Sequence, residues 1–363
     1  MKQPTKKPSL RDLCLNSLGE YFLATNPSYN YVDYQQERIV PAIEGLEAGG
    51  YERLMIFIAA GHAKTDIGTK SFIPWYMGRN PGHNVILFCH TAPLAKDFGS
   101  DIRNRMTKNE AHAAVFPNLK IDTSNHASDF FRTNQGGAFY AFGMDGGASG
   151  RRGDLVVIED PIRDLQDALS ETVQHVLYNT YKAVIKDRLR PGGKILFIMT
   201  RWAVRDMAAR ILEDEGRRWK VLALKAQEEE PDGPYLWESH FGRERYAEAK
   251  QDTYIWNAKW QQNPTPLMNQ SFKLEWLKFY LPEGRPTEYH EDGSIKAQAA
   301  AVEKMFRLNT YIFVDPALGK GSQHDRTCIL VPGCSFGDLV CGVIARPQAG
   351  FPKLQNAANQ PEK

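Results

Sequence analysis

The feature that most constrains this chain is an apolar run at residues 54–58, which leads into a turn of small residues ending in Lys64 and Thr65. The run has the composition of a strand buried on both faces of a parallel sheet. In a strand–turn–helix arrangement, backbone N–H groups face an anion, the lysine reaches the β- and γ-phosphates of a nucleotide, and the hydroxyl binds Mg²⁺. The sequence therefore predicts a phosphate-binding turn formed by Gly61, His62, Ala63, Lys64 and Thr65.

This turn departs from the usual pattern G-x-x-x-x-G-K-[ST], because Ile58 and Ala63 occupy the positions of the two glycines. Alanine still allows the backbone to approach a phosphate closely, whereas isoleucine lacks the freedom of glycine at positive φ. The alternative is an ordinary strand-to-helix turn with a solvated lysine. The turn alone does not decide between the two interpretations.

Two further apolar strands end in polar residues. Residues 155–158 precede Glu159 and Asp160, and residues 195–199 precede Thr200. Acids at the carboxyl end of a buried strand can hold Mg²⁺ and polarise an attacking water, and a polar residue after the next strand can sense the γ-phosphate. The alternatives are a strand that ends in a polar turn, and a threonine that caps a helix. The order of the segments favours catalytic Glu159, Asp160 and Thr200.

In combination, these segments resemble the large terminase subunit of tailed bacteriophages, the ATPase that packages DNA into the procapsid. The resemblance extends over about residues 31–344 and rests on six motifs in the same order. These are residues 61–65, 159–162, 200–210, 219–224, 256–264 and 311–317.

The resemblance implies an ATPase that uses ATP and Mg²⁺ to translocate double-stranded DNA. It implies a homo-oligomeric ring on the procapsid, with a portal protein and a small terminase subunit as partners, in the cytoplasm of a bacterial host. It also implies an RNase H-like nuclease, in which Asp315 and Asp325 would bind Mg²⁺ or Mn²⁺. Gln35 stands where related motors often place an adenine contact, and a solvated helix start is the alternative.

The chain differs from the family pattern at two places. The first acid is Glu159, where the family usually has aspartate, and Ala59 and Ala60 stand where many members carry an arginine. Arg151 and Arg152, in a glycine-rich turn, are candidates to supply the missing charge to a neighbouring subunit as an arginine finger. Exposed turn residues or DNA contacts are the alternatives.

The alternation of strands and helices after residue 50 predicts an α/β fold: a mostly parallel P-loop sheet with helices on both faces, followed by a partial RNase H-like α/β domain. We expect a helical region at 1–50, an ATPase domain with a lid at 51–270, a linker at 271–305 and a nuclease domain at 306–363. Lys64, Glu159, Asp160 and Thr200 all follow predicted strands, where such sheets bind ligands.

Members of the family continue beyond the point at which this chain ends. We therefore expect a C-terminally truncated and inactive nuclease. A non-catalytic prophage remnant that only binds nucleotide or DNA is the alternative to an active packaging motor. A helicase-like ATPase is a third interpretation, which leaves the segment around Asp315 unexplained.

The 363 residues are 42% hydrophobic and 24% charged, which is enough for two domains with hydrophobic cores. The net charge of +2 does not by itself indicate a nucleic-acid partner, so any DNA contact must come from local basic clusters. Two clusters are candidates: Arg201, Arg205, Arg210, Arg217 and Arg218, and Lys182, Lys186, Arg188 and Arg190.

The five cysteines form no C-x-x-C pair, which favours reduced thiols and gives no evident zinc site. The N-terminus lacks the apolar segment of a secretory signal. No apolar run is long enough to cross a bilayer, so we expect no membrane partner.

Overall fold

The computed structural model describes residues 8–146, 150–228 and 231–266, and the backbone of 309–310, 313–315, 328–335 and 338–345. The chain divides into two compact units, Met1–Leu267 and Met268–Lys363. No helix among the described residues is long and apolar enough to cross a membrane.

Most of the described residues before residue 50 are helical, as the sequence predicted. Ser9 and Ser17 begin the first two helices, where each hydroxyl accepts a hydrogen bond from a backbone N–H of the first turn. The elements are α1 (Leu10–Asn16), α2 (Leu18–Thr25), a π-helical turn (Gln35–Ile39) and α3 (Val40–Glu47).

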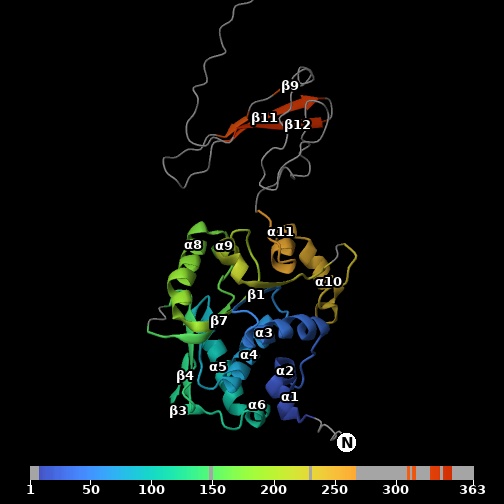
Figure 1. The fold of residues 1–363 in the computed structure, drawn as a ribbon. Coiled ribbons are helices and arrows are strands. Elements are labelled where there is room, and N and C mark those ends of the chain that lie inside the picture. The colour runs from blue at the N-terminus through green and yellow to red at the C-terminus, as the bar shows by residue number, and fades with distance from the viewer. Residues whose placement is uncertain are drawn as a thin grey trace, which may run out of the picture. The chain divides into compact units, whose positions relative to one another are not determined.

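An eight-stranded sheet forms the centre of the first unit (Figure 1). The strands are β1 (Arg53–Ile58), β2 (Asn84–Cys89), β3 (Ile121–His126), β4 (Phe130–Thr133), β5 (Ala138–Gly143), β6 (Gly153–Glu159), β7 (Leu189–Met199) and β8 (Lys220–Leu224). Their order in the sheet is β3-β4-β5-β2-β6-β7-β1-β8. Each neighbouring pair from β5 through β2, β6, β7 and β1 to β8 is parallel. The predicted mostly parallel α/β fold is confirmed. The antiparallel strands β3 and β4, of which β3 forms an edge of the sheet, were not predicted.

Helices cover both faces of this sheet, as expected for parallel strands joined by crossovers. They are α4 (Phe72–Arg79), α5 (Ala92–Lys108), α6 (Glu110–Val115), α7 (Leu165–Leu169), α8 (Glu171–Thr180) and α9 (Met207–Glu215). Short π-helical turns (Asp66–Ser71 and Tyr181–Ile185) and 3₁₀ turns (Lys186–Arg188 and Gly216–Arg218) extend them.

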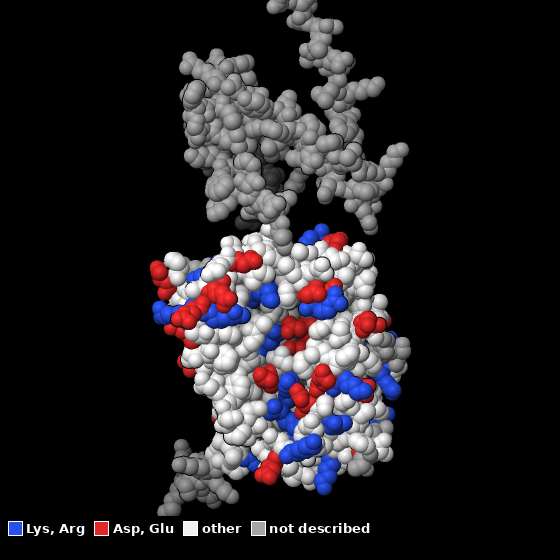
Figure 2. Space-filling model, turned by 180° about the vertical axis from the view of Figure 1, so that it is seen from behind, with Lys and Arg blue, Asp and Glu red and all other residues white. Residues whose placement is uncertain are grey.

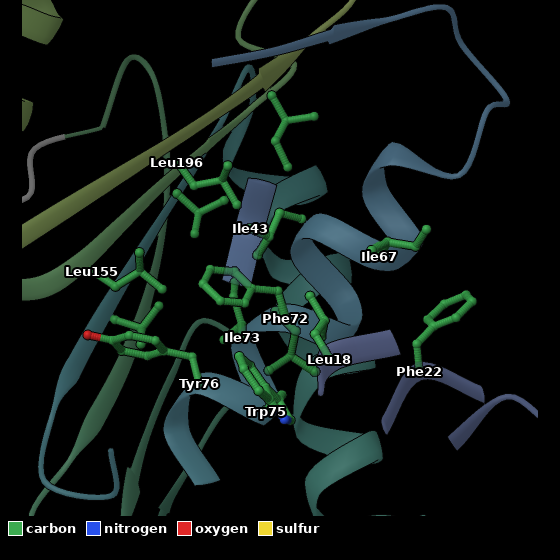
Figure 3. Close-up of a cluster of buried hydrophobic side chains, with 14 of the residues drawn as sticks. Leu18, Phe22, Ile43, Ile67, Phe72, Ile73, Trp75, Tyr76, Leu155 and Leu196 are labelled. Carbon is green, nitrogen blue, oxygen red and sulfur yellow. The ribbon is translucent and has the colours of Figure 1, made fainter. Parts of the chain in front are cut away.

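Two hydrophobic cores lie on opposite faces of the sheet, because alternate side chains of a strand point to opposite sides. Leu54 and Ile56 of β1 join the core that contains α2, α3 and α4, whereas Met55 and Phe57 join the core beneath α8 and α9. Figure 3 shows the first core around Phe72. Burial of each such large side chain contributes about 1.5–3 kcal/mol, so these cores hold the strand ends in place.

A small helical subdomain follows β8, and we call residues 226–263 the lid. It contains α10 (Glu238–Lys250), α11 (Thr253–Ile255) and a π-helical turn (Trp256–Trp260). The lid has its own core of Ala226, Tyr246 and Trp256. The helical character predicted for residues 239–262 is present here.

The second unit contains a sheet in which β10 (Phe313–Asp315), β11 (Cys328–Ser335) and β12 (Asp338–Ala345) are antiparallel. The short strand β9 (Asn309–Thr310) pairs with β11. The strands predicted in this part of the sequence are present. The RNase H-like assignment stays a prediction, and the predicted linker lies outside the described residues.

Candidate active site

Three parallel strands bring the predicted ATPase residues together. In the sheet, β7 lies between β6 and β1. Phe57 of β1 pairs with Met199 of β7, and Glu159 of β6 pairs with Ile198, so the three strands end at the same level. The residues that follow these strands therefore meet at the carboxyl edge of the sheet, where open α/β sheets bind ligands.

The phosphate-binding turn obtains its curvature from two left-handed residues. Gly61 has φ 77° and Ala63 has φ 66°. Ile58 stays within β1, so the position where the usual pattern has its first glycine does not require a positive φ here. The alanine at position 63 adopts a conformation that costs about 1–2 kcal/mol relative to glycine. The helix that contains Lys64 and Thr65 then starts, and its N-terminus faces the turn.

Lys64 holds the ends of the strands together. Its Nζ lies 2.9 Å from Asp160 Oδ2 and donates a 3.1 Å hydrogen bond to Thr200 Oγ1. The Thr200 hydroxyl donates to the carbonyl of Ile58 at 2.9 Å, and the Thr200 amide donates to Asp160 Oδ1 at 3.0 Å. The lysine, the aspartate and the threonine, each following a different strand, thus form one network.

Glu159 is fully buried beside this network. Its carboxylate accepts hydrogen bonds from the hydroxyls of Thr65 and, at 2.5 Å, Thr69. Burial raises the pKa of Glu159 to about 7, and the charge of Asp160 acts in the same direction. The longer glutamate reaches both hydroxyls. Thr69 was not predicted, although its position four residues after Thr65 places it on the same helix face.

Gln35 lies behind the phosphate-binding turn and is completely buried, so the solvated alternative is wrong. Its side-chain amide donates to the hydroxyl of Tyr34 at 3.1 Å, and that hydroxyl donates to the carbonyl of His62, also at 3.1 Å. Gln35 therefore supports the turn through Tyr34. A contact with adenine stays a prediction.

His62 connects the turn to the lid. Its ring stacks on Phe241, with centroids 4.6 Å apart, and its Nε2 lies 3.2 Å from the hydroxyl of Tyr246. Trp237 and Trp260 surround the same ring. Any displacement of the turn must therefore move, or break away from, the aromatic side chains of the lid.

Acidification is expected to lower the free energy of unfolding of this chain through His62. Burial lowers the pKa of His62 to about 4 from its ordinary 6.5, so the folded state keeps the ring neutral. Between these values the unfolded chain binds more protons, and the free energy of unfolding falls as the pH falls. We expect His62 to contribute a loss of about 2 kcal/mol from pH 7 to pH 5, measured by denaturant unfolding of the wild type and of His62→Phe.

The control for this measurement is His175→Phe, because His175 is exposed. Some pH dependence will remain in His62→Phe, since burial also lowers the pKa of His112 to about 4. Identical slopes for the wild type and His62→Phe would contradict the assignment to His62.

Arg151 and Arg152 lie just before β6, at the opposite end of this strand from Glu159. A strand of this length spans roughly 20 Å, so the structure does not bring the two arginines to the site of their own chain. The Arg151 guanidinium lies 4.9 Å from the ring centroid of Tyr140, and Arg152 donates to the carbonyl of Asp187 at 3.5 Å. An arginine finger that acts on a neighbouring subunit stays a prediction.

The predicted nuclease residues are in the second unit. Asp315 ends β10, of which the backbone is described, and Asp325 lies outside the described residues. Among the described residues, no group of three or more His, Cys, Asp or Glu side chains could hold a metal ion. The two-metal nuclease site therefore stays a prediction.

No family model and no curated protein sequence matches this chain. Among solved structures, the chain resembles the large terminase of bacteriophage HK97, with 12% identity, a TM-score of 0.46, and coverage of 90% of this chain and 67% of that one. It also resembles the large terminase ATPase domain of Thermus phage P74-26, with 14% identity, a TM-score of 0.42, and coverage of 66% and 96%. A large terminase from a thermophilic bacteriophage, in complex with ATP-γ-S, has 14% identity, a TM-score of 0.42, and coverage of 84% and 65%.

All three are large terminases, the family that the sequence motifs resemble. At 12–14% identity the likeness concerns the fold, and the chain spans about two thirds of the length of the HK97 protein. The chemistry must come from the residues of this site.

Proposed function

We propose that this chain hydrolyses ATP and uses the energy to move double-stranded DNA, as the large terminase subunit of a bacteriophage. The observation that carries the proposal is the position of Lys64, whose ammonium contacts Asp160 and Thr200 at the edge where three parallel strands end. A phosphate-binding lysine, an acid that can act on water and a polar sensor are thus within direct contact of one another.

The residues present fit a nucleotide-bound Mg²⁺ ion. Mg²⁺ prefers oxygen ligands and usually combines one or two carboxylates with substrate phosphates and water. Thr65 and Glu159 supply a hydroxyl and a carboxylate in direct contact, with Asp160 adjacent. When bound, the ion neutralises charge on the phosphates.

Lys64, Asp160 and Thr200 each have a different role in the proposed reaction. In the structure Lys64 is paired with Asp160, so an incoming γ-phosphate must compete for the ammonium and release the carboxylate. The freed Asp160 orients a water and accepts its proton while the water oxygen attacks phosphorus and the bond to the β-phosphate oxygen breaks. The products are ADP and phosphate. Thr200 is hydrogen-bonded to both Lys64 and Asp160, so this exchange of partners changes the hydrogen bonds of Thr200 directly.

The segment after β7 connects the site to the lid by a second route. Gln262 accepts a 3.0 Å hydrogen bond from the Arg201 amide, and Tyr254 donates a 2.7 Å bond to the carbonyl of Trp202. With the His62 contacts, both the phosphate-binding turn and the sensor segment are attached to the lid. Loss of the γ-phosphate can therefore move the lid, which is the motion that we propose drives DNA.

Much of the basic charge predicted to contact DNA is already paired. Arg201 pairs with Asp206 at 2.7 Å, Arg210 with Glu171 at 2.6 Å, Arg190 with Asp154 at 2.9 Å, and Lys186 with Glu215. Figure 2 shows basic and acidic side chains intermixed on one face of the molecule. The exposed cations that remain from the two predicted clusters are Lys182, Arg205, Arg217 and Arg218. We propose these four as the phosphate contacts of DNA.

Double-stranded DNA is expected to raise the rate of phosphate release. Non-specific phosphate contacts release counterions, so the stimulation should fall steeply between about 50 and 200 mM salt. Replacing the four exposed cations by alanine should reduce the slope of log affinity against log salt by up to about four. A phosphate-release assay with random-sequence DNA measures the stimulation, and fluorescence anisotropy measures the slope.

The matched control replaces Arg243 and Arg245 by alanine, because both are exposed lid arginines outside the predicted clusters. Hydrolysis that does not respond to DNA at low salt would contradict the motor. Nucleotide binding without hydrolysis would favour the alternative of a non-catalytic remnant.

A further inference from the structure

The site as described supplies little positive charge for a triphosphate. Residues 59–65 contain one cation, Lys64, and Asp160 already neutralises part of its charge. The neighbouring Arg201 is engaged by Asp206 at 2.7 Å and lies over the ring of Phe57. Besides Mg²⁺, a further protein cation would therefore stabilise a nucleotide triphosphate bound here.

Lys259 of the lid is the cation whose position meets this need. It is half-buried, and its Nζ lies 4.0 Å from the ring centroid of Trp202, two residues after the sensor Thr200. It forms no ion pair with any carboxylate in the described part of the chain. Burial and the charge of Lys64 lower the pKa of Lys259, and the charge of Asp160 opposes them. The backbone of Lys259 is also tied to the sensor segment, because Gln262 donates a hydrogen bond to the Lys259 carbonyl and accepts one from the Arg201 amide.

We propose that Lys259 is a second phosphate-binding cation of this site, whose ammonium leaves the Trp202 ring to bind the γ-phosphate of ATP. This inference rests on the proposed function. A phosphate oxygen is a stronger partner for an ammonium than an aromatic ring, because the bond is charge-assisted. It also removes the repulsion from Lys64, since the phosphate places negative charge between the two cations.

The position of Lys259 in the lid makes the contact a switch. It belongs to the π-helical turn Trp256–Trp260, and Trp260 packs against His62. A bond from the γ-phosphate to Lys259 holds the lid over the site, and hydrolysis releases it. ATP and ADP should therefore differ in how firmly they fix the lid.

The test is calorimetric titration of wild type and Lys259→Met with ADP and with β,γ-imido-ATP, both with Mg²⁺. We expect the variant to bind the imido analogue about 10-fold more weakly or worse, with ADP affinity changed less than about 2-fold. Lys259→Arg should recover most of the affinity. The matched control is Lys250→Met, because Lys250 also lies over lid aromatic rings, those of Tyr235 and Trp256.

Equal losses for both nucleotides, or no loss, in Lys259→Met would overturn the inference while leaving nucleotide binding by the wild type intact. A wild type that binds neither nucleotide would overturn the proposed function itself. Should Lys259→Met fail to fold, reductive methylation of the wild type decides the question. The imido analogue should slow labelling of Lys259 several-fold and ADP should not, and equal labelling overturns the inference.

Discussion

Replacement of Lys64 by alanine is expected to abolish ATP hydrolysis by this chain. The change removes the ammonium that would bind the phosphates, and charge-assisted hydrogen bonds of this kind are each worth about 1.5–3 kcal/mol. It also leaves Asp160 without its partner at 2.9 Å. We expect the rate of phosphate release, measured with saturating Mg²⁺ and ATP, to fall by at least about 100-fold.

Lys70→Ala is the matched control, because Lys70 lies six residues further along the same helical segment and pairs with Asp101, which is more exposed than Asp160, at 2.8 Å. This surface pair contributes little to stability. A Lys64→Ala protein that hydrolyses ATP at the wild-type rate would show that the phosphates bind elsewhere.

Asp160→Asn is expected to separate binding from hydrolysis. The amide preserves the shape of the side chain and can still accept the bond from the Thr200 amide, now 3.0 Å long. It cannot accept a proton from water, and loss of a general base typically lowers the rate by about 10²–10⁴-fold. We therefore expect affinity for ATP to be retained and turnover to fall by this factor in single-turnover experiments.

Asp154→Asn provides the comparison, because Asp154 lies near the start of β6, the strand that Asp160 follows, and pairs with Arg190 at 2.9 Å. Its turnover should match that of the wild type. Wild-type turnover in Asp160→Asn would require another group to act as the base, and Glu159 would then be the residue to examine.

Much of the site could be predicted because the geometry of parallel sheets is simple. Three apolar runs read as buried strands, and the polar residues after them had to meet at one edge. In the sequence, Ile58 is an apparent defect of the phosphate-binding turn, because it stands where the usual pattern has a glycine. The structure resolves it, because Gly61 and Ala63 provide both left-handed residues and Ile58 stays in the strand.

Contacts between distant segments could not be predicted. His62 meets Phe241 and Tyr246, which lie about 180 residues later in the chain, and no periodicity in the sequence encodes such a contact. Strand β3 was missed because its sequence, IDTSNH, is mostly polar, and its identity comes from pairing with β4. Tertiary context overrides propensity in such edge strands.

The sequence also could not show which side chains of the basic clusters are free to contact DNA. A run of arginines along a helix looks the same in sequence whether its members face solvent or a carboxylate. Arg201 and Arg210 are held by Asp206 and Glu171, and both bonds depend on side-chain directions that the fold sets. The predicted DNA contacts therefore reduce to the exposed members.

The central claim is that the network around Lys64 is a nucleotide site, and direct calorimetric titration with Mg²⁺ and a non-hydrolysable ATP analogue tests it. We predict one binding site per chain in the wild type and in Lys70→Ala, and no measurable binding in Lys64→Ala. A wild-type protein that is folded by circular dichroism and yet releases no heat of binding across several temperatures would contradict the account.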